Sequence, residues 1–397
     1  MVYLHALFLM ALLAPLVLWW GMLLDWLLRG RDIERLAELP ADVLPNLGWP
    51  SMTVIVPARD EERSIEPALR SLATQDYPGL KIVVVDDRST DQTASLLLSL
   101  SREFSTISIE TIRELPSGWL GKTHALWRGA QRAGQAKWFL FTDADVVYEP
   151  ASLRRAVRYA EAQGIDLLTL YPGLILGGFW ERAVIASFGL LSFVAYAPWR
   201  VNNPQSGAYF ATGAFNLVRR EAYERAGGHR PLALEVIDDA RLCWLMKQAG
   251  ARVKVIIGLG AIRVRWQVGV AGIVQGLTKN FFAGFNYSLA KAIAGSAGIL
   301  LFSVVPFFGM MRLPHLSGWL SAASVVALFA LYQLSSRGTG VSFLFATTHP
   351  LGAMVMIFII FRSAFVTLMG GGVTWRGTHY SLRELKEGRR SERTSSI

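Results

Sequence analysis

The sequence of 397 residues has very little cysteine and few charged residues. Its single cysteine, Cys243, excludes an internal disulfide, which agrees with a reducing compartment. No basic run with interleaved aromatic residues is present, which argues against nucleic acid as a partner. Only 18% of the residues are charged, whereas 52% are hydrophobic, and the net charge is +10. This balance suits an anionic membrane surface and an anionic substrate.

The apolar residues are unevenly distributed, and the first long run is at the N-terminus. Val2–Leu24 has His5 as its only polar exception, and it is long enough to cross a bilayer. A cleaved signal peptide is the alternative, but no basic segment precedes the run and no small-x-small site closes it cleanly. We therefore predict a transmembrane anchor over residues 1–27 and a polar, proline-punctuated connector over residues 28–50.

Further apolar segments occur in the second half of the chain. About three membrane helices are predicted within residues 281–372, at Ile293–Met311, Gly318–Leu334 and Leu351–Met369. The uncharged segment Ala183–Trp199 is short for a span. With Trp180 and Trp199 at its ends it predicts an interfacial segment within residues 173–200. A buried core helix is the open alternative.

The orientation follows from the basic residues of the globular part, which the positive-inside rule places in the cytoplasm. We therefore expect a multi-pass protein of the cell (inner) membrane with a cytoplasmic globular domain. The tail, residues 373–397, is also basic. Three C-terminal spans would place it opposite the globular domain, whereas the charge rule keeps it on the same side.

The globular part alternates short apolar runs with helical patterns. This order predicts an α/β fold with a mostly parallel sheet and helices on both faces. The expected strands are Thr53–Ala58, Lys81–Val85, Ile107–Ile112, Trp138–Thr142, Phe215–Arg219 and Arg252–Ile257. The expected helices are Glu61–Thr74, one from about Asp91, Lys122–Ala133, Arg220–Ala226 and Asp238–Gln248.

Two carboxylates, Asp143 and Asp145, follow the apolar run that begins at Trp138. Residues i and i+2 of a strand point to the same side, so both carboxylates can face one ion. Oxygen ligands suit Mg²⁺ or Mn²⁺, which commonly bridge to ligand phosphates. A solvated strand end or a helix N-cap is the alternative.

Two other acidic pairs, Asp60-Glu61 and Asp86-Asp87, also follow expected strands. Ligands of parallel sheets bind beyond the carboxyl ends of the strands. Three acidic clusters at one edge of a sheet therefore predict a ligand site there.

Four motifs occur in a fixed order: IVPARDEE (residues 55–62), VVVDDRSTDQT (83–93), TDADV (142–146) and IDDARL (237–242). With these residues the chain resembles the inverting, nucleotide-sugar-dependent glycosyltransferases of family two, which have a GT-A fold. The resemblance covers residues 51–280. The flanking membrane segments, together with GWLGKTHAL (118–126) and WRGTHYSLR (375–383), resemble the ceramide-glucosyltransferase-like branch, which includes hopanoid- and carotenoid-associated transferases.

The resemblance implies roles for the acidic and basic residues of these motifs. Asp86 or Asp87 would hydrogen-bond the base or the ribose, and Lys122 would add positive charge near the phosphates. Asp143 and Asp145 would hold the metal against the diphosphate. Lys122 as a solvated helix-start lysine is the open alternative. The nucleotide-sugar pocket would be formed by Pro57, Arg59, Glu61, Asp86, Asp87, Lys122 and Asp143.

The catalytic base of this family lies in an E-D motif at the start of a helix. Here the pair is Asp238-Asp239, and alignment to E-D-x-x-L makes Asp239 the base and Leu242 the trailing apolar residue. Two adjacent carboxylates near a cleft can raise a pKa into a useful range. A helix N-terminus that merely favours acidic residues is the alternative.

One family motif, Q/R-x-x-R-W, is incomplete in this chain. Gln275 fits its first position, but Thr278-Lys279 replaces the Arg-Trp pair, and Lys279 is a candidate for the missing phosphate contact. This departure argues against long-chain polysaccharide synthesis and against assuming ceramide as the acceptor.

The resemblance therefore implies a membrane-bound, metal-dependent, inverting glycosyltransferase that uses a nucleotide sugar, with UDP-glucose as the favoured donor. The expected acceptor is a lipid hydroxyl at the cytoplasmic membrane face. A polyprenyl-phosphate or polysaccharide-type transferase is the alternative enzyme, and a membrane scaffold with an inactive transferase domain is the non-enzyme alternative.

Overall fold

The computed structural model describes residues 2–30, 33–41 and 48–394. The chain divides into two compact units. An apolar helical unit comprises Met1–Asp32, Leu176–Ala197 and Gln267–Trp375, and an α/β unit comprises Ile33–Ile175, Pro198–Trp266 and Arg376–Ile397. Part of the predicted connector, residues 42–47, lies outside the described residues.

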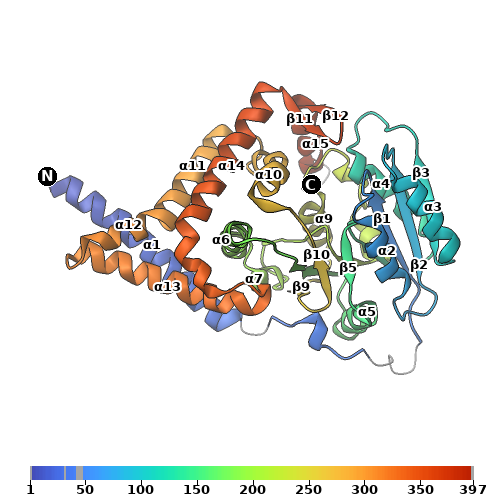
Figure 1. The fold of residues 1–397 in the computed structure, drawn as a ribbon, viewed down its shortest axis with the longest axis horizontal. Helices are drawn as coiled ribbons and strands as arrows, with labels where there is room; N and C mark the ends of the chain where they lie inside the picture. Colours follow the sequence, from blue (N-terminus) through green and yellow to red (C-terminus); the bar gives the residue numbers. More distant parts are fainter. Residues whose placement is uncertain (1, 31–32, 42–47, 395–397) are drawn as a thin grey trace. The chain divides into compact units, whose positions relative to one another are not determined.

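The α/β unit is built on a seven-stranded sheet with the order β3-β2-β1-β4-β8-β6-β9. Figure 1 labels β1, β2, β3 and β9 of this sheet. Strand β8 runs antiparallel to both of its neighbours, and the other strand pairs of this sheet are parallel. The prediction of a mostly parallel sheet is confirmed. The strands are β1 Met52–Ala58, β2 Lys81–Asp87, β3 Ile107–Ile112, β4 Trp138–Phe141, β6 Leu167–Tyr171, β8 Asn216–Arg219 and β9 Val253–Ile257.

Helices cover both faces of this sheet because successive residues of a strand point to opposite sides. Val54 and Val56 of β1 pack into a core with α2 (Ile65–Ala73), α3 (Thr93–Glu103) and α5 (Ser152–Gln163). Ile55, between them, packs into a second core with helices of the other face. Those helices are α4 Gly121–Arg132, α8 Arg220–Arg225 and α9 Asp238–Gln248.

The remaining elements of the α/β unit are short. A three-stranded sheet has the order β5-β10-β7, in which β10 is antiparallel to β5 and parallel to β7. The elements are η1 Leu36–Glu38, β5 Val146–Tyr148, β7 Gly173–Leu174, α7 Pro198–Val201, η2 Arg230–Leu232, β10 Ile262–Val264, β12 Thr378–Ser381 and α15 Leu382–Thr394.

Helix α2 begins at Ile65, four residues later than the sequence predicts. Asp60 has a left-handed φ of 55°, and its carboxylate accepts a hydrogen bond of 2.7 Å from the backbone N–H of Thr90. The backbone N–H of Glu61 donates to the hydroxyl of Thr93 at 2.8 Å. The two acidic residues thus join the loops that follow β1 and β2, and the helix starts only after them.

The apolar unit consists of helices and one short strand. Among the described residues, five segments are long and apolar enough to cross a membrane: Ala11–Arg29, Phe179–Val201, Leu289–Arg312, Leu316–Ser336 and Phe343–Met369. The elements are α1 Val2–Arg29, α6 Phe179–Tyr196, α10 Gly269–Gly284, α11 Leu289–Ile299, η3 Leu300–Val304, α12 Val305–Gly309, η4 Met310–Arg312, α13 Leu316–Thr339, η5 Phe343–Thr348, α14 His349–Met369 and β11 Gly372–Trp375.

Helix α6 is the segment that the sequence predicts as too short to cross, yet it extends back through Glu181-Arg182 to Phe179. Glu181 is buried, and its carboxylate accepts hydrogen bonds of 2.7 Å from the backbone N–H groups of Gly177 and Gly269. A buried carboxylate with such partners does not interrupt an apolar helix. Helix α6 packs against α10 and α14 within its unit.

Candidate active site

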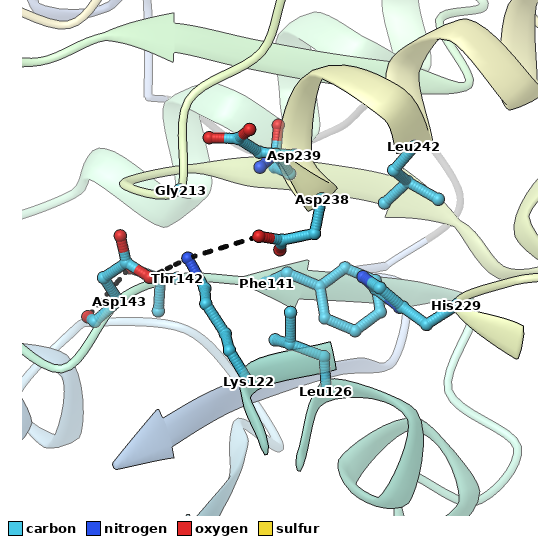
Figure 2. Close-up of a pocket in the computed structure, with 11 residues that line it drawn as sticks. Lys122, Leu126, Phe141, Thr142, Asp143, Gly213, His229, Asp238, Asp239 and Leu242 are labelled. Atoms are coloured by element: carbon cyan, nitrogen blue, oxygen red, sulfur yellow. Dashed lines mark hydrogen bonds and ion pairs between the residues drawn. The ribbon is translucent and has the colours of Figure 1, made fainter. Parts of the chain in front are cut away.

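A pocket of the α/β unit brings together five segments that are distant in the sequence (Figure 2). They are the first turns of α4, the end of β4, the loop into β8, the residue before η2 and the first turn of α9. The lining residues are Lys122, Leu126, Phe141, Thr142, Asp143, Gly213, Asn216, His229, Asp238, Asp239 and Leu242. The pocket therefore combines the predicted Lys122, the first carboxylate of the D-x-D motif and both carboxylates of the Asp-Asp motif.

Lys122 lies between the carboxylates of the pocket, as the dashed lines of Figure 2 show. Its Nζ is 2.7 Å from Oδ1 of Asp143 and 3.9 Å from Oδ1 of Asp238. Burial disfavours its charge, but Asp143, Asp238 and Asp239 raise its pKa well above the ordinary value. Lys122 therefore stays protonated and is paired with carboxylates, and its contact with the phosphates stays a prediction.

The D-x-D motif lies beyond strand β4 and not on it. Strand β4 ends at Phe141, and the chain then bends into a turn before β5. The hydroxyl of Thr142 donates to the carbonyl of Ala214 at 2.8 Å, and the backbone N–H of Asp143 donates to the carbonyl of Gly213 at 3.0 Å. These bonds replace the strand pairing, so the expectation that strand alternation aligns the two carboxylates is wrong.

The two carboxylates nevertheless belong to one cluster of negative charge. Burial, followed by the charges of Asp143 and Glu61, raises the pKa of Asp145 to about 7. A divalent cation would relieve this repulsion, and carboxylate oxygens are the ligands that Mg²⁺ and Mn²⁺ prefer. No group of three or more His, Cys, Asp or Glu residues suited to a metal occurs in the part of the chain that the structure describes. The residues present fit a cation held by Asp143 and Asp145 together with a ligand's phosphates, and this role stays a prediction.

The residues predicted for the nucleotide lie at the carboxyl ends of β1 and β2. Pro57 pairs with Val85 inside the sheet, and Arg59 lies just beyond β1 with its Nη1 3.8 Å from Oδ2 of Asp87. Asp87 also accepts hydrogen bonds of 2.8 and 3.1 Å from the guanidinium of Arg88. Oδ1 of Asp86 accepts from the backbone N–H of Ser89 at 3.2 Å, which closes a turn after β2.

The C-terminal tail contacts this group of residues. Arg376 donates from Nη2 to Oε1 of Glu61 at 2.7 Å and from Nη1 to the carbonyl of Arg59 at 2.8 Å. The hydroxyl of Tyr380 accepts a hydrogen bond of 3.3 Å from the backbone N–H of Gly121. The sequence predicts a basic tail and does not show that it packs on the predicted nucleotide residues. The sequence signal for this contact was the motif WRGTHYSLR, which contains Arg376 and Tyr380.

The Asp-Asp motif forms the first turn of α9, as the sequence predicts. Asp238 is buried and faces Lys122, whereas Asp239 is partly exposed, and its Oδ1 accepts from the backbone N–H of Ala240 at 2.7 Å. The two neighbours therefore have different environments. The structure also adds Gly213, Asn216 and His229, which the sequence analysis does not single out. The sequence signal for His229 as a pocket residue was its position shortly before the Asp-Asp motif.

Gln275 and Lys279 lie on α10 in the apolar unit, whereas every residue that lines the pocket belongs to the α/β unit. Nζ of Lys279 lies 4.1 Å from the centroid of the Trp375 ring and donates to Oδ1 of Asn280 at 3.0 Å. Such a cation–π contact holds a lysine against an aromatic face. The predicted contact of these two residues with the nucleotide sugar stays a prediction.

The model of the family described as "Glycosyltransferase like family 2" matches residues 50–259, more than half of the chain. The chain belongs to this family. The predicted resemblance is thereby confirmed, and the protein is a glycosyltransferase by family.

Relatives of known name are similar over most of the chain. The 4,4'-diaponeurosporenoate glycosyltransferase of Staphylococcus aureus (strain USA300) is 27% identical over 358 residues, which cover 88% of this chain and 93% of the relative. The enzyme of the same name from strain MRSA252 is 26% identical over the same shares. The similarity extends beyond the α/β unit into the apolar helices.

A solved structure supports the fold. A mannosyltransferase of Pyrobaculum calidifontis in complex with GDP-Man and Mn²⁺ has a TM-score of 0.54 and 19% sequence identity. The match covers 91% of this chain and 98% of that chain. The predicted GT-A fold is confirmed.

Gly213 offers a test of the pocket. A Cβ at this position would lie 2.3 Å from Oδ2 of Asp143 and 2.9 Å from Nζ of Lys122. The substitution Gly213→Ala must therefore displace both groups, and we expect glycosyl transfer to fall about 10- to 100-fold, as a misplacement near 1 Å does. The matched control is Gly207→Ala, where a Cβ meets nothing within 4 Å. Equal turnover of the two variants in a donor-consumption assay would contradict this role of the pocket.

Proposed function

We propose that the protein transfers a sugar, with UDP-glucose as donor, to the polar group of an apolar lipid at the cytoplasmic face of the cell membrane. The observation that carries this proposal is the pocket in which Lys122 lies between Asp143 and the Asp238-Asp239 pair. These groups provide a diphosphate end and a base end within one site. The same chain contains apolar helices that can anchor the site at a membrane.

The donor would bind across the carboxyl ends of β1, β2 and β4, where ligands of such sheets bind. The carboxylates of Asp86 and Asp87 suit a uracil imide N–H or a ribose hydroxyl because a carboxylate accepts hydrogen bonds without donating. Arg59 holds Asp87 in place at this end. The choice of UDP-glucose rests on the family resemblance of the motifs.

A divalent cation, Mg²⁺ or Mn²⁺, would supply Lewis-acid stabilisation of the diphosphate when bound. Asp143 and Asp145 would hold it, as their clustered charge favours. Lys122 would move its ammonium from Asp143 toward the phosphates as these carboxylates take up the cation. The remaining contact with Asp238 would keep the ammonium group of Lys122 protonated.

Inversion requires attack on the anomeric carbon from the side opposite the leaving diphosphate, and a hydroxyl that attacks there needs a base. Asp239 would take the proton of an acceptor hydroxyl as that oxygen forms its bond to the anomeric carbon and the diphosphate leaves. Asp238, which is buried beside Lys122, would position that lysine instead. The difference in burial between the two neighbours supports this division of roles.

A second chemical class of acceptor, a carboxylate instead of a hydroxyl, also has support. The relative from Staphylococcus aureus is named for 4,4'-diaponeurosporenoate, which by its name is a carboxylate. An acceptor of that class would be a carboxylate on an apolar chain, and the product would be a glycosyl ester. A carboxylate needs no base because it is already ionised at neutral pH. A lipid hydroxyl, in contrast, requires Asp239.

The proposed function predicts a glycolipid product. Purified protein with Mn²⁺, UDP-glucose and a panel of apolar hydroxyl and carboxylate lipids should release UDP and form one glycosylated lipid, detected by mass spectrometry. The product should carry the β-configuration from the α-linked donor, as inversion requires. Release of UDP without any glycolipid, or a product with retained configuration, would contradict the proposal.

The Asp-Asp pair separates the two acceptor classes. With a hydroxyl acceptor, Asp239→Asn should lower kcat by about 10²- to 10⁴-fold with little change in the KM for the donor, because only the base is lost. Asp238→Asn should mainly raise the donor KM, because it removes a partner of Lys122. Steady-state kinetics of both variants provides the measurement. Near-normal kcat in Asp239→Asn would favour the carboxylate acceptor and overturn the hydroxyl mechanism.

We further propose that α6 enters the membrane surface without crossing it. The segments before and after it, Ile33–Ile175 and Pro198–Trp266, fold into one unit and share one sheet, with β6 before the helix and β8 after it. A single crossing would place these segments on opposite sides of the membrane. This reasoning supports the predicted interfacial segment despite the length of the helix.

The same reasoning applies to the C-terminal helices. Arg376 contacts Glu61, so the tail rejoins the α/β unit after three candidate spans. Only an even number of crossings between Gln267 and Trp375 returns the chain to the same side. We therefore propose that one of the three candidate spans does not cross, which resolves the conflict between span number and the charge of the tail.

Cysteine labelling tests this topology, and the native Cys243 is buried and gives little background. The exposed positions Ser105, Gln205 and Lys386 lie before α6, after α6 and in the tail. Single cysteines at these positions should react with a membrane-impermeant maleimide from the cytoplasmic side only, in inverted but not in right-side-out vesicles. Labelling of Gln205→Cys or Lys386→Cys from the opposite side to Ser105→Cys would contradict it.

A further inference from the structure

Two buried polar atoms that line the pocket have no hydrogen-bond partner among the described residues: Nε2 of His229 and Oδ1 of Asn216. The two side chains are 1% and 3% exposed. Buried polar atoms almost always have partners, and at a pocket that partner is a water molecule or a ligand. Neither residue has a role in the chemistry described above.

The hydrogen bonds around His229 assign its tautomer. The hydroxyl of Tyr223 accepts from the backbone N–H of His229 at 3.1 Å and lies 2.8 Å from Nδ1 of the same residue. Burial raises the pKa of Tyr223, so its hydroxyl keeps its hydrogen. We assign that hydrogen to the 2.8 Å contact, in which Nδ1 accepts it. Nδ1 is therefore an acceptor, and the hydrogen of the neutral ring lies on Nε2.

The ring is held in this state and orientation by its surroundings. The ring of Phe141 meets it edge to face, with centroids 4.7 Å apart and an interplanar angle of 76°. Burial, with a further contribution from Lys122, lowers the pKa of His229 to about 3, so the ring is neutral at physiological pH. His229 therefore presents one fixed N–H donor at the pocket. Figure 2 shows its ring beside Phe141 and across the pocket from Asp143.

Asn216 provides the complementary group. Its Nδ2 donates to the carbonyl of Thr212 at 2.6 Å, which leaves Oδ1 as an acceptor. The pocket thus contains a fixed neutral donor and a fixed neutral acceptor in addition to its charges. A hydroxyl both accepts and donates, so this pair matches a ligand that carries several hydroxyl groups.

We propose that His229 is a specificity-determining residue that donates its Nε2–H to a hydroxyl of the transferred sugar, with Oδ1 of Asn216 accepting from a hydroxyl of the same sugar. This inference rests on the proposed function and names the part of the site that recognises the hexose. An apolar lipid offers few such hydroxyls, whereas a hexose offers several. The proximity of Lys122 and Asp143, assigned to the diphosphate, places the adjoining sugar within the same pocket.

Two substitutions separate recognition of the sugar from support of the fold. In His229→Asn, the amide oxygen takes the place of Nδ1 and still accepts from Tyr223, but the donor at Nε2 is lost. In His229→Gln, the amide N–H₂ reaches the place of Nε2, but the contact with Tyr223 is lost. A recognition role predicts that His229→Gln binds the sugar better than His229→Asn does, and a purely structural role predicts the reverse.

The readout is calorimetric binding of UDP-glucose and of UDP, each with Mn²⁺, to the full-length protein. We expect His229→Asn to weaken UDP-glucose binding roughly 2- to 10-fold, as the loss of one neutral hydrogen bond does, and to leave UDP binding unchanged. We expect His229→Gln to restore most of that loss. Equal affinity of wild type and His229→Asn for UDP-glucose would show that Nε2 holds only a buried water and would overturn the proposal. Equal losses for UDP-glucose and UDP would also overturn it.

Deoxy analogues of UDP-glucose identify the hydroxyl. One of the 2-, 3-, 4- and 6-deoxy sugars should bind wild type as weakly as UDP-glucose binds His229→Asn, with no further loss in that variant. Additive losses for all four analogues would contradict the contact. Binding of UDP-glucose without transfer to any lipid would contradict the proposed acceptor, and the binding test of His229 would still be valid. If wild type does not bind UDP-glucose, the proposed donor is wrong, and GDP-mannose against GDP decides the role of His229 in the same way.

Discussion

The pocket depends on the ammonium group of Lys122, which lies among carboxylates contributed by the turn after β4 and by α9. A buried charge is costly unless it is paired, and each partner here is acidic. Without this lysine, Asp143, Asp238 and Asp239 would repel one another, and the buried Asp238 would lose a neighbouring positive charge. The lysine therefore lies between the residue predicted to bind the metal and the Asp-Asp pair predicted to contain the base, and its charge offsets theirs.

The close approach of these charged groups is possible because glycine lies beside them. Gly121 leaves room for the carboxylate of Asp87, and Gly213 leaves room for Asp143 and Lys122. In both cases a Cβ would lie 2.3 Å from a carboxylate oxygen. Gly121 is the first residue of α4 and Gly213 lies shortly before β8, and the hydrophobic cores fix the positions of this helix and this strand. The charged groups of the site are thus positioned by packing at some distance from the pocket.

The tail links the site to the membrane part of the chain. Arg376 and Tyr380 contact the loop after β1 and the start of α4, and they follow the last apolar helix in the sequence. This connection limits the membrane topology, because a chain that begins and ends in the same folded unit must return to the same side. It also places tail residues at the predicted nucleotide end of the site. In the sequence, their motif indicates only a resemblance to the family branch.

The sequence by itself determined most strands and helices of the α/β unit, the acidic residues near the strand ends and the family, but it did not predict α5 or β6. These features are local: apolar runs, helix periodicity and short motifs are contiguous in the chain, and Ile107–Ile112 and Asp238–Gln248 have the predicted bounds. Only the tertiary structure decided that the D-x-D motif lies in a turn, that Lys122 faces Asp143 and Asp238, and that the tail contacts Glu61. It also brought Gly213, Asn216 and His229 into the pocket. These relations join residues far apart in the chain, and a single sequence contains no record of which distant side chains fill the same space.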